Sequence, residues 1–326
     1  MTAIVPMEPS LWTAATHGQT GAVLQLLAFG ADINEKGGPG ESTPLHQAVC
    51  QGFTDIVRVL LEHGANASAE DGYEGETALH MAVLNVEALD TVKLLLQYGA
   101  NASAPSNNGT TPLHYAVDTC YDEVFKLQVV DMLLKNGADP CTNDSDQKTP
   151  LHQVVQHGTE EMALLLIENG ADVNVKNISG HTPLHLSVYS SYDLAWERGE
   201  DMALLLLEQG AEMNAICNGG NTALHGSAAS GQWVLVNLLL ERGADIYSQN
   251  NKGETALDLS VGSTYREWRH EQVDTLLRAE EARLEEEVRR QAKWNAFVMG
   301  QHVRLGKESC VISLPSEITK MVLDMT

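Results

Sequence analysis

One tetrapeptide recurs along this chain and constrains its fold more than any other feature. Thr, then Pro or Ala, then Leu and His appear at residues 43–46, 77–80, 111–114, 149–152, 182–185 and 222–225. A degenerate copy occupies residues 255–258, and a further one begins at residue 9. The copies start 33 to 40 residues apart, a period typical of stacked supersecondary units rather than of one closed core. The sequence therefore predicts eight repeated units.

Each unit predicts two short helices followed by a turn-rich hairpin. Thr is a favourable N-cap and Pro suits the first helical turn, so Thr43-Pro44 and its copies start the first helix. The second helix carries apolar residues at helical spacing, such as Ile56 and Leu60. It ends at a glycine, Gly64 in this unit, which accepts the left-handed conformation of a C′ residue. The expected fold class is all-α.

The repeated pattern resembles that of ankyrin repeats over residues 9–277. This resemblance implies a solenoid of helix-turn-helix units whose β-hairpin fingers project beside a concave groove, the surface on which such proteins bind other proteins. It assigns partner contacts to the residues just before each Thr and to one hairpin tip, namely Ser42, Glu76, Thr110, Lys148, His181, Asn221 and Glu254 before each Thr and Tyr73 at the tip.

Scarce aromatic residues outside the repeat pattern add candidates, because Tyr and Trp are enriched in interface hot spots. These are Trp233 and, in a longer sixth unit, Tyr189, Tyr192 and Trp196. Local packing is the alternative role for Tyr189, Trp196 and Trp233. The extra residues of the fourth unit, around 118–128, and of the sixth, around 189–199, fall between paired helices and are expected to protrude.

The C-terminal part departs from the repeats. The eighth unit lacks the His and the terminal Gly, so we expect a tail over 1–8, repeats over 9–277, a charged helix over 278–299 and a separate segment over 300–326. In that last segment Leu-Pro-x-Glu-Ile precedes an apolar helix, which resembles the truncated F-box-like motif of poxvirus-type ankyrin proteins. The resemblance implies binding of a Skp-type cullin adaptor through Leu314, Pro315, Glu317, Ile318, Val322 and Leu323. The alternative is that residues 294–323 cover the apolar end of the stack.

Charge narrows the class of partner. Lys and Arg number 20 against 44 Asp and Glu, a formal net charge of −24, which disfavours direct binding to nucleic acid or an anionic membrane. A protein partner with a basic or apolar surface is expected. The five cysteines are scattered without a CxxC pair, and no apolar stretch approaches membrane-spanning length, so we expect a cytoplasmic or nuclear protein.

Residues that suggest chemistry have simpler roles. One His per repeat cannot form a zinc site, because packed helices lie about 8–10 Å apart whereas zinc ligands lie about 2 Å from a shared ion. We expect these histidines to hydrogen-bond the backbone between adjacent hairpins. Motifs for nucleophilic catalysis or phosphate binding do not occur, so neither an enzyme nor a cofactor is expected. Asn34, Asn174 and Asn214 resemble ankyrin asparagines that become hydroxylated, the alternative being hairpin capping.

The function expected from the sequence is a non-catalytic protein-protein interaction scaffold. One alternative is a substrate-recruiting subunit of a cullin-type ubiquitin ligase, in which the F-box-like segment binds the adaptor. Another is an inhibitor that masks a transcription factor or kinase, which requires only the repeats.

Overall fold

Paired short helices make up the regular structure in the computed structural model, which describes residues 10–85, 88–118, 123–188, 196–261 and 267–304. The chain divides into two units, Met1–Ala223 and Leu224–Thr326. Unit 1 contains the pairs α1 (Leu11–Thr16) and α2 (Thr20–Ala28), α3 (Pro44–Cys50) and α4 (Thr54–Glu62), α5 (Ala78–Val83) and α6 (Leu89–Gln97), α7 (Pro112–Asp118) and α8 (Glu123–Lys135), α9 (Pro150–His157) and α10 (Glu160–Glu168), and α11 (Pro183–Ser187) and α12 (Trp196–Glu208). This arrangement confirms the predicted all-α repeat fold.

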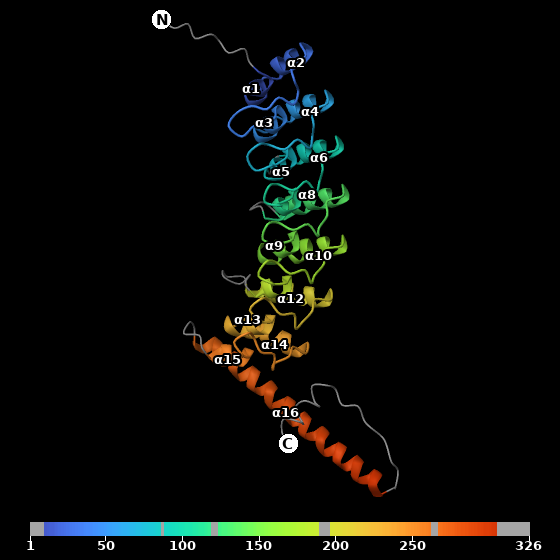
Figure 1. Ribbon diagram of the computed structural model, residues 1–326, viewed down its shortest axis with the longest axis vertical. Helices are drawn as coiled ribbons and strands as arrows, with labels where there is room; N and C mark the ends of the chain where they lie inside the picture. The colour runs from blue at the N-terminus through green and yellow to red at the C-terminus, as the bar shows by residue number, and fades with distance from the viewer. Residues whose placement is uncertain (1–9, 86–87, 119–122, 189–195, 262–266, 305–326) are drawn as a thin grey trace. The chain divides into compact units, whose positions relative to one another are not determined.

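Within unit 1 the first helices of the pairs form one row and the second helices another (Figure 1). Consecutive first helices pack on each other from α1 through α11, and each also packs on the second helix of its own pair. The motif leucines Leu45, Leu79, Leu113, Leu151 and Leu184 are at most 1% exposed and fill the space between the rows. Two residues after the His, buried Ala48, Ala82, Ala116 and Ser187 allow the first helices to approach closely.

The motif threonines begin the first helices, as predicted. Thr43 precedes α3 with an extended backbone, φ −84° and ψ 166°, and Pro44 occupies the first turn. The Thr43 N–H donates to Nδ1 of His46 at 3.2 Å, so the His side chain satisfies a main-chain donor that the helix leaves unpaired. α4 ends before Gly64, whose φ of 92° is the left-handed conformation that the sequence predicted.

The hairpins contain less β structure than the sequence suggested. In the described ranges the pairing consists of single antiparallel bridges, between Gly37 and Ser42 and between Glu70 and Thr77, with no strand. Further hairpin hydrogen bonds join main-chain groups within one hairpin, join one hairpin to the next, or close a turn around an Asp or Asn side chain.

The extra length of the fourth and sixth units does not simply protrude. α8 and α12 each have 13 residues against nine in α4, α6 and α10, so part of each extension lengthens the second helix. In α8 the added turn is held by Lys126, which is 7% exposed and whose Nζ lies 3.4 Å from a carboxylate oxygen of Glu123. The other Glu123 oxygen is buried without a hydrogen-bond partner in the described part of the chain.

Unit 2 contains α13 (Ala223–Ala229), which begins at the unit boundary, then α14 (Trp233–Glu241), α15 (Ala256–Val261) and the 38-residue α16 (Glu267–Arg304). α16 packs on α14 and α15 through buried Val273 and Leu277. It then continues through Gly300 to Arg304, beyond the predicted end at 299, because one glycine costs a helix only about 1 kcal/mol.

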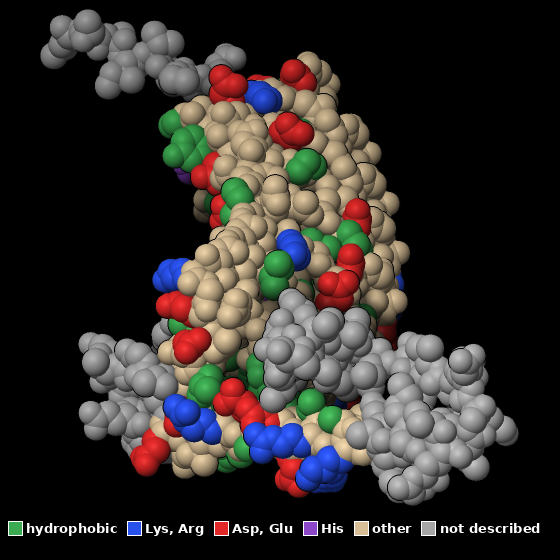
Figure 2. All heavy atoms as spheres, turned by 60° about the horizontal axis from the view of Figure 1, so that its bottom comes forward, with side chains coloured by type: hydrophobic (Ala, Val, Ile, Leu, Met, Phe, Trp, Pro, Cys, Tyr) green, Lys and Arg blue, Asp and Glu red, His purple; other side chains and the backbone are tan. Residues whose placement is uncertain are grey.

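The exposed length of α16 is stabilised by ion pairs between successive turns. A guanidinium nitrogen of Arg289 lies 3.2 Å from a carboxylate oxygen of Glu285, and one of Arg290 lies 3.1 Å from a carboxylate oxygen of Glu286. Figure 2 shows Lys and Arg side chains interspersed with Asp and Glu along this helix. None of the helices in the described ranges is both long and apolar enough to span a bilayer.

The Lys126–Glu123 pair generates a stability prediction. We expect Lys126→Ala to lower the free energy of unfolding by about 1–3 kcal/mol, because it leaves a half-buried carboxylate without its cation. Chemical denaturation followed by circular dichroism measures the change. The double variant Glu123→Gln with Lys126→Met, which keeps the side-chain volume and removes both charges, should recover most of the loss. Equal destabilisation in the single and double variants would show that the charge pairing is not what holds the added turn.

Candidate functional site

The motif histidines connect each repeat to the next. Nε2 of His46 lies 3.1 Å from the carbonyl oxygen of Glu76, the residue just before the next motif Thr. The same bond, at 3.0–3.1 Å, joins His80 to Thr110, His114 to Lys148, His152 to His181, His185 to Asn221 and, in unit 2, His225 to Glu254. These contacts confirm the prediction that the histidines bond backbone between adjacent hairpins.

Both ring nitrogens of these histidines are committed. Nδ1 of His80 accepts the N–H of Thr77 at 3.0 Å, and four other motif histidines repeat the bond. A nitrogen that accepts from an amide carries no proton, so Nε2 carries it and donates to the carbonyl. Burial lowers the pKa of every motif histidine, that of His80 and of His185 to about 4. The rings are therefore held neutral at pH 7.

The two ends of the series replace the histidine. At the first end Trp12 stands at the His position, and its Nε1–H donates to Oγ of Ser42 at 3.1 Å. The indole lies over Gly37 and Gly38, where a Cβ atom on Gly37 would come within 2.6 Å of the ring. At the other end Asp258 accepts the N–H and Oγ–H of Thr255, each at 2.8 Å. The Asp258 carboxylate thus pairs the donors at the helix start without making a bond to a following hairpin.

The hairpin tips of unit 1 form a second connection. Main-chain N–H groups of Gly72, Asn107, Ser145, Ile178 and Asn218 donate to carbonyl oxygens of the preceding hairpin at 2.8–3.0 Å. We call this series of bonds the tip ladder. The fingers are therefore held as one connected row rather than as independent loops, which sequence reasoning did not foresee.

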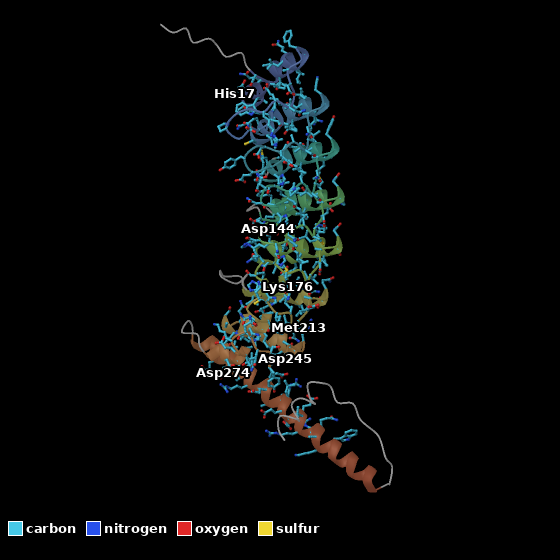
Figure 3. All side chains as sticks on the ribbon, viewed as in Figure 1. His17, Asp144, Lys176, Met213, Asp245 and Asp274 are labelled. Carbon is cyan, nitrogen blue, oxygen red and sulfur yellow. The ribbon has the colours of Figure 1, made fainter. Side chains whose placement is uncertain are left out.

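Three hairpins of unit 1 are also closed by a side chain at the base. Oδ1 of Asp71 accepts the N–H groups of Tyr73, Glu74 and Glu76 at 3.1–3.3 Å. Asp144 and Asn177 do the same in later hairpins of unit 1. Figure 3 labels Asp144 and Lys176, which come from successive hairpins. Because the turns are closed internally, the side chains at the tips are displayed on fixed backbone.

The predicted contact residues have different side-chain environments, although those before the later motif threonines share a backbone role. Tyr73 at a tip is 75% exposed, whereas Ser42, at the position before the first motif Thr, is buried. Lys148 lies 3.6 Å from Asp146. The rings of His181 and His185 lie 5.6 Å apart. Thr110, Asn221 and Glu254 are partly exposed, and Trp233 begins α14 and is 43% exposed.

Glu76 and Tyr115 form a polar pair that the sequence did not predict. The Tyr115 hydroxyl donates to a carboxylate oxygen of Glu76, and its ring stacks edge-on against His80 with centroids 5.8 Å apart. Burial raises the pKa of Glu76 and of Tyr115. Tyr115 is the residue directly after the motif residue His114. Its place in the repeat was the feature of the sequence from which this pair could have been predicted.

Other predicted residues lie elsewhere. Asn34 and Asn174 bridge repeats: Oδ1 of Asn34 accepts the N–H of Asn66 at 2.9 Å, and Oδ1 of Asn174 accepts that of Glu212 at 2.8 Å. Asn214 is exposed. Trp196 begins α12, and outside the described residues lie Tyr189, Tyr192, Leu314, Pro315, Glu317, Ile318, Val322 and Leu323.

Across the described ranges no three His, Cys, Asp or Glu side chains are grouped to hold a metal ion.

Comparison with protein families matches the repeats. A model of three ankyrin-repeat copies matches residues 11–106, 74–144 and 126–215, and a model of many ankyrin-repeat copies matches residues 206–260. A search of curated proteins finds no match.

The buried histidines generate a pH prediction. Unfolded histidines take up protons near pH 6.5, whereas His80 and His185 keep a pKa of about 4 in the fold. Their contribution to stability is therefore complete above about pH 6.5 and is lost as the pH falls toward 4. We expect each to lower the free energy of unfolding by about 2 kcal/mol between pH 7 and pH 5, measured by urea denaturation at the two values.

Paired variants separate this effect from general acid sensitivity. His80→Gln with His185→Gln should reduce the difference in unfolding free energy between pH 7 and pH 5. The matched variant His17→Gln with His63→Gln changes two exposed histidines and should leave that difference as it is. An unchanged pH dependence in the first variant would contradict the assignment.

Proposed function

The chain belongs to the ankyrin-repeat family, and from that premise we propose that it is a non-catalytic scaffold that binds a partner protein on its hairpins and first helices. Ankyrin repeats are protein-protein interaction modules and are typically non-enzymatic. The hairpins suit such a role, because hydrogen bonds between repeats fix their backbone while their exposed side chains differ from repeat to repeat.

The histidine bonds are the observation that carries this proposal. The carbonyl oxygen just before each motif Thr is held by the His of the preceding repeat, while the side chain at that position is Glu76, Thr110, Lys148, His181, Asn221 or Glu254. The same backbone therefore displays a different chemical group in each repeat. Little backbone ordering opposes association when the contact residues are already fixed.

Charge supports a partner with a basic surface. Residues 1–263 hold 10 basic and 33 acidic side chains, whereas residues 264–326 hold 10 basic and 11 acidic side chains. The negative charge thus belongs to the repeats and accelerates encounter with a basic protein at low ionic strength. The absence of CxxC pairs and the cysteine scattering fit our proposal of a cytoplasmic or nuclear location.

A second candidate function rests on the sequence of residues 314–323, which resembles a truncated F-box opening. In this alternative the repeats bind a substrate and the C-terminal segment binds a Skp-type cullin adaptor. A third, an inhibitor that masks a transcription factor or kinase, requires only the repeats. The segment distinguishes them, because an inhibitor is expected to keep its activity without residues 308–326 and an adaptor-binding subunit is not.

Affinity purification with mass spectrometry tests these roles. The full chain and a chain ending at Lys307 are compared after circular dichroism has shown that both melt cooperatively. A cullin adaptor recovered with the full chain alone would favour the ligase subunit. Identical partners from both chains would favour the scaffold. If neither chain recovers a partner, both the scaffold and the ligase-subunit proposals are contradicted.

Once a partner is identified, surface variants locate its binding face. We expect Tyr73→Ser, Lys148→Ser and His181→Ser, combined, to weaken binding at least tenfold, and we expect binding by the parent chain to weaken as the salt concentration rises, because its acidic side chains attract a basic partner. The matched control is Phe29→Ser, Lys93→Ser and His63→Ser, which changes exposed residues of the same types at the second helices. Isothermal titration calorimetry at 50 and 300 mM salt measures both effects. Equal losses in the two variants would contradict binding on the hairpins.

A further inference from the structure

The tip ladder of unit 1 displays two large apolar side chains at the same position of different hairpins. Tyr73 lies four residues before Thr77 and is 75% exposed, and Ile178 lies four residues before Thr182 and is 58% exposed. The corresponding residues of the other unit 1 hairpins are Pro39, Asn107, Ser145 and Asn218. Exposed apolar side chains on internally closed turns favour contact with a partner.

The ladder also fixes the separation of the two side chains. Three steps connect them, from the Glu74 carbonyl to Asn107, from Asn108 to Ser145 and from Asp146 to Ile178, each a main-chain hydrogen bond of 2.8–2.9 Å. With about 8–10 Å between packed helices, three repeats span roughly 24–30 Å. An extended peptide advances about 3.3 Å per residue, so roughly eight residues cover this distance.

Acidic side chains surround Tyr73. Glu41, Glu70 and Glu74 are exposed, and Glu41 lies against the Tyr73 hairpin, where a Cβ atom on Gly72 would come within 2.6 Å of the Glu41 Cβ. Among the described residues no ion pair neutralises these three carboxylates. A guanidinium group stacks on a phenol ring and pairs with carboxylates at once, so this end fits an arginine side chain.

The Ile178 end lacks this excess of negative charge. Ile216 in the next hairpin is 52% exposed, and Nζ of Lys176 donates to its carbonyl oxygen at 2.8 Å. Lys148 belongs to the hairpin on the other side. The carboxylate of Asp146, whose carbonyl accepts the Ile178 N–H, lies 3.6 Å from Lys148 and offsets part of the lysine charge. This end therefore accepts an apolar group and attracts a cationic one less strongly than the Tyr73 end does.

Building on the proposed function, we propose that the tip ladder binds one extended peptide segment of the partner, with arginine against Tyr73 and its carboxylates and a large apolar side chain about eight residues away against Ile178 and Ile216. The difference in charge between the two ends sets the direction of the peptide. Neither anchor alone provides the affinity of the pair, since the second contact becomes intramolecular once the first has formed.

Synthetic peptides test the spacing. The probe carries Arg-Arg at one end, a Ser-Gly-Thr spacer of eight residues and Leu-Phe at the other end, with a fluorophore, and is made in both chain directions. We expect one direction to bind the full-length protein at least tenfold more tightly than peptides with a three-residue spacer, with Ala-Ala for Arg-Arg, or with Ala-Ala for Leu-Phe. Fluorescence anisotropy measures the affinities.

Protein variants test which side chain each anchor contacts. Tyr73→Ser should weaken the parent peptide but have little effect on the peptide without arginine, and Ile178→Ser should behave in the same way toward the peptide without Leu-Phe. Phe29→Ser, which changes an 88% exposed aromatic residue outside the ladder, should affect none of them. Circular dichroism verifies that all three variants fold.

The outcomes also separate this proposal from the proposed function. Undetectable peptide binding, affinity independent of spacer length, or equal effects of Phe29→Ser and Tyr73→Ser would overturn the two-anchor segment. If a purified partner still binds and is lost with Lys148→Ser and His181→Ser but not with Tyr73→Ser and Ile178→Ser, the scaffold stands and the segment is wrong. If no protein partner binds at all, the scaffold itself fails.

Discussion

The hydrogen bond from a motif histidine to the next hairpin is the interaction on which the rest of the structure depends. One ring nitrogen accepts the amide that starts its own helix, and the other donates to the carbonyl before the next helix start. A single side chain thus fixes a local element and its neighbour together. Because the first bond is buried and the second is partly buried, leaving either main-chain group unpaired carries a desolvation cost.

This connection separates the residues that hold the stack from those whose side chains differ between repeats. The His, the Leu before it and the small residue two positions after it are buried. The position before each Thr contributes its main-chain carbonyl to the stack, so its side chain is free to differ between repeats. Ser42 is an exception, because its side-chain hydroxyl accepts a hydrogen bond from the indole N–H of Trp12 in the first repeat.

The ends of the series follow the same physical logic. Trp12 reaches the next hairpin with an indole N–H, and its larger ring requires glycines beneath it. Asp258 replaces only one of the histidine's two hydrogen bonds. Its carboxylate accepts the N–H of Thr255 at the helix start, but it has no proton to donate to a carbonyl of a following hairpin. α16 then continues without the glycine that ends the other second helices.

The sequence by itself determined the repeat period, the helix starts at the motif threonines, the left-handed glycines and the inter-repeat role of the histidines. These depend on residues close in the chain and on chemistry with few alternatives. The tertiary structure alone decided the tip ladder, the Glu76–Tyr115 pair and the added turn of α8 around buried Lys126. Each joins groups whose separation depends on how successive repeats stack or on where a side chain becomes buried, and neither is encoded in local spacing.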